Sequence, residues 1–287
     1  MAAKRSASRY QATGRRPIGP TKRLRLREGL RPYTTRLQKG GALIADMRQV
    51  LLQWDGAPGC AERIIRTNAL SAPSRSRALD VVTRTFIPRF VQSNPPDLWR
   101  PVRLFEQAGW SQAALLPIHY YAAAVAEPLL WDFAVEVLAE KHAKGHQEVS
   151  VSDVLRFLDR SQDSRFPGRR WSKEVSIRVA RGLLASLRDF GVLAGAVKKR
   201  LSPLYLPPET FAFIARLRYE LGIRGHSALQ DTCWRLFFLG ETAVERFFLE
   251  THQRKLLTYL AAGTVIRIEF PGASLEDYAR ELTQRAH

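Results

Sequence analysis

Residues 172–206 have the sequence SKEVSIRVARGLLASLRDFGVLAGAVKKRLSPLYL. Ser172 is a good N-cap residue and Gly191 is a helix stop, so the spacing predicts a helix over residues 172–189 between them. At about 100° per residue, the apolar side chains fall on one face of this helix and three arginines fall on the opposite face. The arginines are Arg178, Arg181 and Arg188. One face is therefore expected to pack into a core, and the other to present guanidinium groups.

Two short apolar runs, 192–197 and 201–206, follow this helix and predict a β-hairpin. Three basic residues separate the runs: Lys198, Lys199 and Arg200. A helix, a glycine stop and a hairpin with a basic tip follow one another in the order of a winged-helix module, in which the last helix meets a groove and the wing touches the backbone. The alternatives are a hairpin that binds nothing and a winged-helix fold that docks proteins.

Helical spacing of apolar residues covers most of the remaining chain, so the fold class is mainly all-α. We expect an N-terminal helical bundle over 33–145 and a C-terminal helical domain over 146–287, which contains the winged-helix-like segment. Within them, one helix is predicted over 34–53 and another over 241–262. One further short strand is predicted over 264–270, where apolar and polar residues alternate.

The first 39 residues carry twelve Lys or Arg and one acid, so they hold eleven of the chain's formal net charge of +18. Such a segment repels itself and has little to bury, which predicts a disordered basic arm over residues 1–32. Nucleic acid is the obvious polyanion to neutralise it, since phosphates release counterions when Lys and Arg replace them. The arm residues expected to contact phosphates are Arg15, Arg16, Lys22, Arg23, Arg25 and Arg27. Anionic lipid, ribosomal RNA, organelle targeting and mere solubility remain alternatives.

A second basic group lies in the predicted bundle and consists of Arg75, Arg77, Arg84 and Arg89. These residues would extend a phosphate-binding track onto the bundle, with Arg75 and Arg77 as its first candidates. A solvated helix face explains all four equally well.

Other patterns restrict the class of protein. Only two cysteines occur, Cys60 and Cys233, so neither a disulfide framework nor a cysteine-based zinc site is encoded, and a reducing cytoplasm is the natural compartment. His142 and His146 are four residues apart, but no third metal ligand is indicated. The most membrane-like stretch, 113–138, is interrupted by charges and prolines and predicts a pair of buried helices. We expect no catalytic residues, metal, cofactor, small-molecule substrate or membrane span.

Three stretches then show a resemblance to a known family: IIRTNAL at 64–70, WDFAVEVLAEK at 131–141, and the helix and glycine stop at 172–193. Over about residues 33–270 the chain resembles BrxA, the small helical component of BREX phage-defence systems. The resemblance implies a two-domain cytoplasmic protein with a bundle similar to the NusB antitermination fold. It also implies binding to double-stranded DNA beside the other BREX components. It supplies no catalytic residues, and the long basic arm departs from it.

The sequence thus favours a non-enzymatic, largely sequence-independent DNA-binding component of a phage-defence complex. Sequence readout is expected to be weak, because no Asn or Gln accompanies the arginines of the 172–189 helix to read adenine. One alternative is a protein-docking scaffold of the same complex, with partly exposed aromatic residues at Phe237, Phe238, Phe247 and Phe248. Another is an RNA-binding, NusB-like factor.

Overall fold

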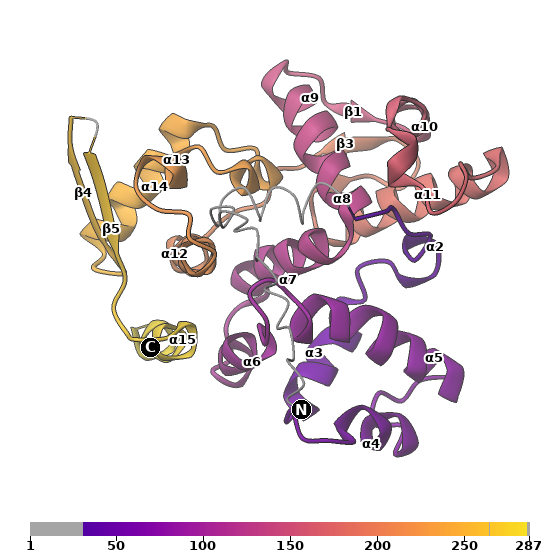
Figure 1. Cartoon of the computed structure of the whole chain (residues 1–287), viewed down its shortest axis with the longest axis horizontal. Coiled ribbons are helices and arrows are strands. Elements are labelled where there is room, and N and C mark those ends of the chain that lie inside the picture. Colours follow the sequence, from indigo (N-terminus) through magenta and orange to yellow (C-terminus); the bar gives the residue numbers. More distant parts are fainter. Residues whose placement is uncertain (1–30, 264, 286–287) are drawn as a thin grey trace, which may run out of the picture.

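The computed structural model describes residues 31–263 and 265–285 and is mainly helical, with two small antiparallel sheets (Figure 1). The helices before the first strand are α2 (Leu37–Gly40), α3 (Ile44–Gln53), α4 (Cys60–Arg66), α5 (Arg75–Leu79), the π-helix η1 (Asp80–Val91), α6 (Trp99–Gln107), α7 (Gln112–Ala126), α8 (Pro128–Asp132), the π-helix η2 (Phe133–Leu138) and α9 (Ala139–Ala143). The elements after them are β1 (Glu148–Val149), α10 (Val151–Arg160), the 3-10 turn η3 (Asp163–Arg165), α11 (Lys173–Asp189), β2 (Leu193–Ala194), β3 (Lys199–Leu201), α12 (Pro208–Glu220), α13 (His226–Leu229), the 3-10 helix η4 (Thr232–Phe237), α14 (Glu241–Gln253), β4 (Thr258–Ala262), β5 (Val265–Glu269) and α15 (Leu275–Arg285).

Helix α7 crosses the middle of the molecule and is buried over most of its length (Figure 1). Apolar residues occupy every side of it, and a helix of that kind is stable only inside a core. η1 and α6 pack against it from the N-terminal half, and α12 packs against it from the C-terminal half. The stretch 113–138 therefore forms buried helices, as predicted. No helix among the described residues is long and apolar enough to cross a bilayer.

The first sheet has the strand order β1–β3–β2, with all pairs antiparallel. Leu193 pairs with Leu201 and both are buried, whereas Glu148 pairs with Arg200 and both are exposed. The alternation of buried and exposed pairs gives the sheet one face against the core. α10 and α11 lie between β1 and β2 in the chain and pack on each other. From β1 onward the order is therefore strand, helix, helix, strand, strand.

The predicted extents of the hairpin strands are wrong. β2 covers two residues of the run 192–197, and β3 begins at Lys199 and ends at Leu201. Lys199 and Arg200 consequently lie in a strand, while Lys198 alone of the three lies in the turn. The chain after Leu201 cannot extend the ladder regularly, because Pro203 has no N–H to donate.

The single helix predicted over 34–53 is also wrong, because the chain turns between α2 and α3. Gly41 has φ 56° and Leu43 has φ 52°, both in the left-handed region. The Arg89 guanidinium, which is buried, donates hydrogen bonds to the carbonyl of Ala42 at 2.7 Å and to that of Gly41 at 3.1 Å. A contact with a residue nearly fifty positions away therefore holds the turn.

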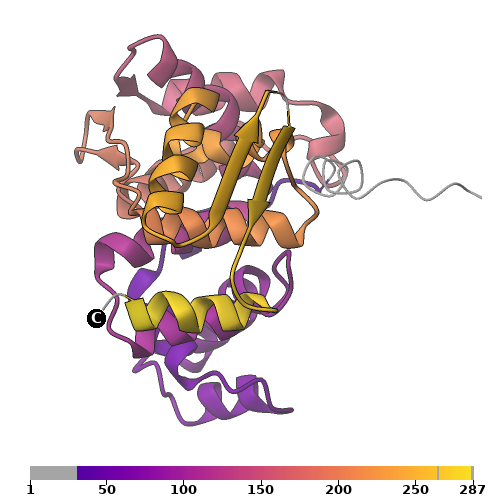
Figure 2. The ribbon, with the colours of Figure 1, turned by 90° about the vertical axis from the view of Figure 1, so that its left-hand side faces the viewer.

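The helix predicted over 241–262 is wrong in its second half. α14 ends at Gln253, and residues 258–262 form β4, which pairs antiparallel with β5. The strand predicted over 264–270 is confirmed over 265–269, but its partner strand β4 was not predicted. The two strands form a hairpin on the outside of α14, in the foreground of Figure 2.

Several contacts cross the domain boundary predicted at residue 145. α2 packs on α11, α7 on α12 and α6 on α15. Figure 2 shows α15 lying across helices of the N-terminal half. The division into two domains and the NusB-like bundle stay predictions.

Candidate nucleic-acid interface

Helix α11 is held in place by two of its neighbours. Ser172 begins it by accepting a hydrogen bond from the N–H of Val175 at 3.4 Å. α10 packs on one side, and α2 packs on another at Gly182. A Cβ at Gly182 would lie 2.3 Å from the carbonyl oxygen of Leu37, so only glycine allows this approach. The buried residues are the apolar Val179, Ala180, Leu183, Leu184 and Leu187, together with Ser186.

The outer face of α11 presents the three arginines that the sequence placed there, and all three are exposed. Arg188 bonds its neighbour Asp189 at 2.9 Å. Neither Arg178 nor Arg181 forms a hydrogen bond or ion pair with another described residue. Two guanidinium groups of this face are thus available to an anion.

The turn between β2 and β3 carries the second group of candidate residues. Lys198 is exposed and has no hydrogen bond or ion pair within the described part of the chain. The Nζ of Lys199 donates to the carbonyl of Ala196 across the turn at 2.8 Å. Arg200 lies 3.9 Å from Glu148 on β1, and both side chains are exposed. The three basic residues therefore differ, and Lys198 is the most available of them.

The second basic group does not form one surface. Arg75 is exposed, Arg77 lies 3.8 Å from Asp46 and Arg84 lies 3.1 Å from Asp80. Arg89 is buried under the turn before α3, and burial lowers the pKa of its guanidinium to about 10. Arg89 is therefore part of neither a phosphate-binding track nor a solvated helix face, the two interpretations proposed from the sequence.

The first described residues anchor the chain that precedes α2. The Arg165 guanidinium donates to the carbonyl of Arg31 at 2.8 Å, pairs with Asp132 and lies 4.5 Å from the ring centroid of Tyr33. The Tyr33 hydroxyl donates to Asp132 at 2.9 Å. Sequence patterns gave no signal for this anchor, since its partners are about a hundred residues apart. The predicted arm contacts all lie outside the described residues: Arg15, Arg16, Lys22, Arg23, Arg25 and Arg27.

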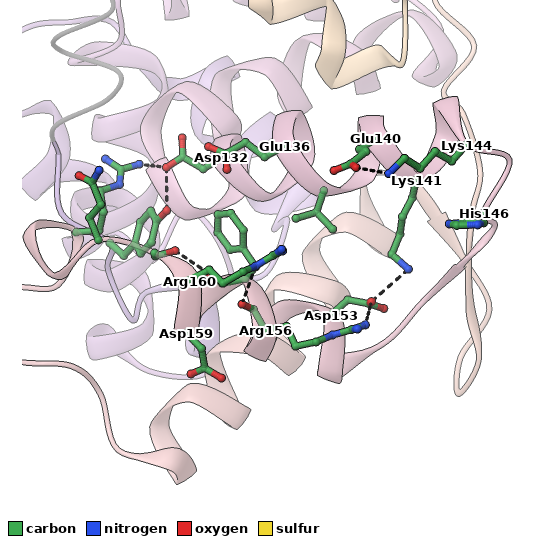
Figure 3. A pocket seen from close by; sticks show the side chains of 16 residues that line it. Asp132, Glu136, Glu140, Lys141, Lys144, His146, Asp153, Arg156, Asp159 and Arg160 are labelled. Atoms are coloured by element: carbon green, nitrogen blue, oxygen red, sulfur yellow. Dashed lines mark hydrogen bonds and ion pairs between the residues drawn. The ribbon is translucent and has the colours of Figure 1, made fainter.

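A groove of about 970 Å³ lies between the continuous helix η2–α9 and α10 (Figure 3). Lys144 forms an ion pair with Glu140 at 2.5 Å, and this cation lowers the pKa of the Glu140 carboxyl. Lys141 and Arg156 lie 3.2 and 2.6 Å from Asp153. Burial opposes ionisation of Asp153, but Ser150 and Lys141 outweigh it and lower the pKa of this carboxyl. Of these pairs, Lys141–Asp153 links α9 to α10, whereas Lys144–Glu140 and Arg156–Asp153 each join residues of one helix or its end.

The structure shows where His142 and the aromatic residues of the docking alternative lie. The ring of His142 stacks on Phe238 with centroids 4.9 Å apart, and no group of His, Cys, Asp or Glu suited to a metal ion occurs among the described residues. Phe238 and Phe247 are half-buried. The expected partial exposure is wrong for Phe237 and Phe248, which are 3% and 1% exposed.

The sequence model of a known protein family matches this part of the chain. The sequence model of the BrxA family matches residues 31–218, well over half of the chain. The chain belongs to the BrxA family. BrxA membership implies a component of a BREX phage-defence system. The matched region begins at the anchor before α2, includes α11 and the β2–β3 hairpin, and ends within α12. No curated protein matches the chain.

Proposed function

We propose that this BrxA-family protein is a non-enzymatic component of a BREX system that binds double-stranded DNA with little regard to its sequence. One observation carries the proposal. The order β1–α10–α11–β2–β3, with β3 between β1 and β2, supports the interpretation as a winged-helix module, and the second helix of this segment exposes three arginines. In helix-turn-helix proteins the corresponding helix lies in the major groove.

Phosphates are the expected targets of these cations. Arg178 and Arg181 are exposed without a hydrogen bond or ion pair to a described residue, so pairing with phosphate would break no salt bridge there. Guanidinium groups form short, often bidentate hydrogen bonds with phosphate oxygens. The net charge of +18 adds a long-range attraction that raises the association rate.

Weak sequence preference follows from the residue types. α11 contains neither Asn nor Gln, the side chains that read adenine in the major groove. Phosphate contacts fix position and orientation without carrying sequence information. The basic arm, if it contacts DNA, contributes affinity of the same kind.

The test compares two double variants in the full chain. R178Q/R181Q removes two cations from the outer face of α11. R224Q/R246Q is the matched control, because Arg224 and Arg246 are also exposed but lie beyond the residues that the family model matches. Fluorescence anisotropy on two unrelated duplexes gives the affinity at several salt concentrations, and a thermal melt checks folding.

We expect R178Q/R181Q to weaken binding to both duplexes and to make the slope of log affinity against log salt shallower by about two. The control should bind like the wild type. Equal affinities for the two double variants would contradict the proposed role of α11. Unchanged DNA binding together with lost phage protection would show instead that this face docks a protein of the complex.

A further inference from the structure

The β2–β3 turn ends in an apolar side chain that is almost fully exposed. Val197 is 94% exposed, although valine normally avoids water. Ala196 beside it is exposed too. The next residue, Lys198, is the cation identified above as the most available of its group. The apex of the turn is therefore small and apolar, with a cation directly beside it.

The turn is held in one shape, so Val197 is fixed at the apex. Gly195 has φ +94°, and a Cβ at this position would lie 2.1 Å from the carbonyl oxygen of Lys198. Only glycine permits this close approach of the two sides of the turn. The bond from Lys199 Nζ to the Ala196 carbonyl links the two sides again.

The two grooves of DNA suit the two parts of this module. An α-helix with its side chains is about 10–12 Å wide and fits the major groove, which is about 12 Å wide. The minor groove is only about 6 Å wide and is bordered by phosphates on both sides. Proteins that enter it commonly place apolar side chains against the sugars and base steps. An apex of Ala196 and Val197 beside a lysine has the size and the chemistry for that groove.

The chain connection places the two parts next to each other. Only Phe190, Gly191 and Val192 lie between the end of α11 and the start of β2. If α11 lies in the major groove, a hairpin attached this closely to it is within reach of the adjacent phosphate backbone and of the neighbouring minor groove.

We propose that the apex of the β2–β3 turn enters the minor groove, with Val197 against the sugars and base edges and Lys198 on a flanking phosphate. This inference rests on the DNA binding proposed above. It adds a second groove contact, made by a residue that carries no charge.

The experiment uses the full chain on an A·T-rich duplex of about 30 base pairs, with and without distamycin, a ligand that fills the minor groove of A·T tracts. Methyl green, a cationic ligand of the major groove, is the control for charge. V197D places a carboxylate at the apex, and V265D is the matched variant, because Val265 is a 68% exposed valine on the other hairpin.

We expect distamycin to weaken wild-type and V265D binding at least fivefold. V197D should bind roughly five- to tenfold more weakly than the wild type and should be insensitive to distamycin. V197D with wild-type affinity and wild-type sensitivity would overturn the inference, and so would a wild-type affinity that only methyl green lowers. In both cases the proposed DNA binding would stand. A wild-type chain that binds no duplex would overturn both proposals.

Discussion

Replacing Gly182 by alanine tests the contact that positions α11. The added Cβ would lie 2.3 Å from Leu37 O, 2.7 Å from Leu37 C and 3.0 Å from Gln38 N. All three are backbone atoms, so α2 has to move away by about 1 Å to restore van der Waals separations. Overpacking of this kind costs about 3 kcal/mol at the upper end of its usual range. The substitution offsets about 1 kcal/mol of this loss, because alanine has a higher helix propensity than glycine.

The net expectation is a loss of about 2 kcal/mol of unfolding free energy. For a protein of this size that corresponds to roughly 3–4 °C in Tm. Differential scanning calorimetry measures it, and G240A is the control, because no atom lies within 4 Å of the Cβ position at Gly240 and its φ is −87°. The control should change stability by less than about 1 kcal/mol. A G182A protein that melts at or above the wild-type temperature would refute the packing of α2 on α11.

Three further outcomes can be checked separately. Deleting residues 1–30 should leave Tm within about 2 °C of the wild-type value and weaken DNA binding measured by anisotropy. Deleting residues 1–34 should also lower Tm, because the buried Tyr33 and its contacts are lost. R89M should lower the urea midpoint by the equivalent of about 2–4 kcal/mol, since the buried carbonyl of Ala42 and the half-buried carbonyl of Gly41 lose their donor. An unchanged midpoint would contradict the role of Arg89 in the turn. Burial lowers the pKa of His119 below its usual 6.5, so the unfolded chain binds the proton first and Tm should fall as the pH drops from 7 to 5. The fall should be smaller in H119Q, where a neutral amide can replace the imidazole beside Glu106.

The sequence was sufficient wherever local rules decide the structure. The start of α11 at Ser172, its end before Gly191 and the exposure of its arginines follow from capping preferences and from a period of 3.6 residues. The alternation over 265–269 likewise predicted β5. Each of these signals lies within one element.

Features that depend on distant partners were not predictable in this way. β1 is two residues long and exists because β3, about fifty residues later, pairs with it. The turn before α3 requires Arg89, and β4 is a strand because β5 pairs with it along its whole length. For the candidate site, periodicity gave the outer face of α11, but the availability of Lys198 and the engagement of Lys199 depend on the shape of the turn.

The salt dependence of duplex binding tests the central claim most directly. The measurement is wild-type affinity for two unrelated duplexes between 50 and 200 mM salt, by anisotropy. If the outer face of α11, the β2–β3 turn and the basic arm neutralise six or more phosphates, affinity should fall by roughly a thousandfold over this range. The two duplexes should give the same slope of log affinity against log salt. A flat salt response, or no binding at 50 mM salt, would contradict the assignment of this protein as a DNA-binding component.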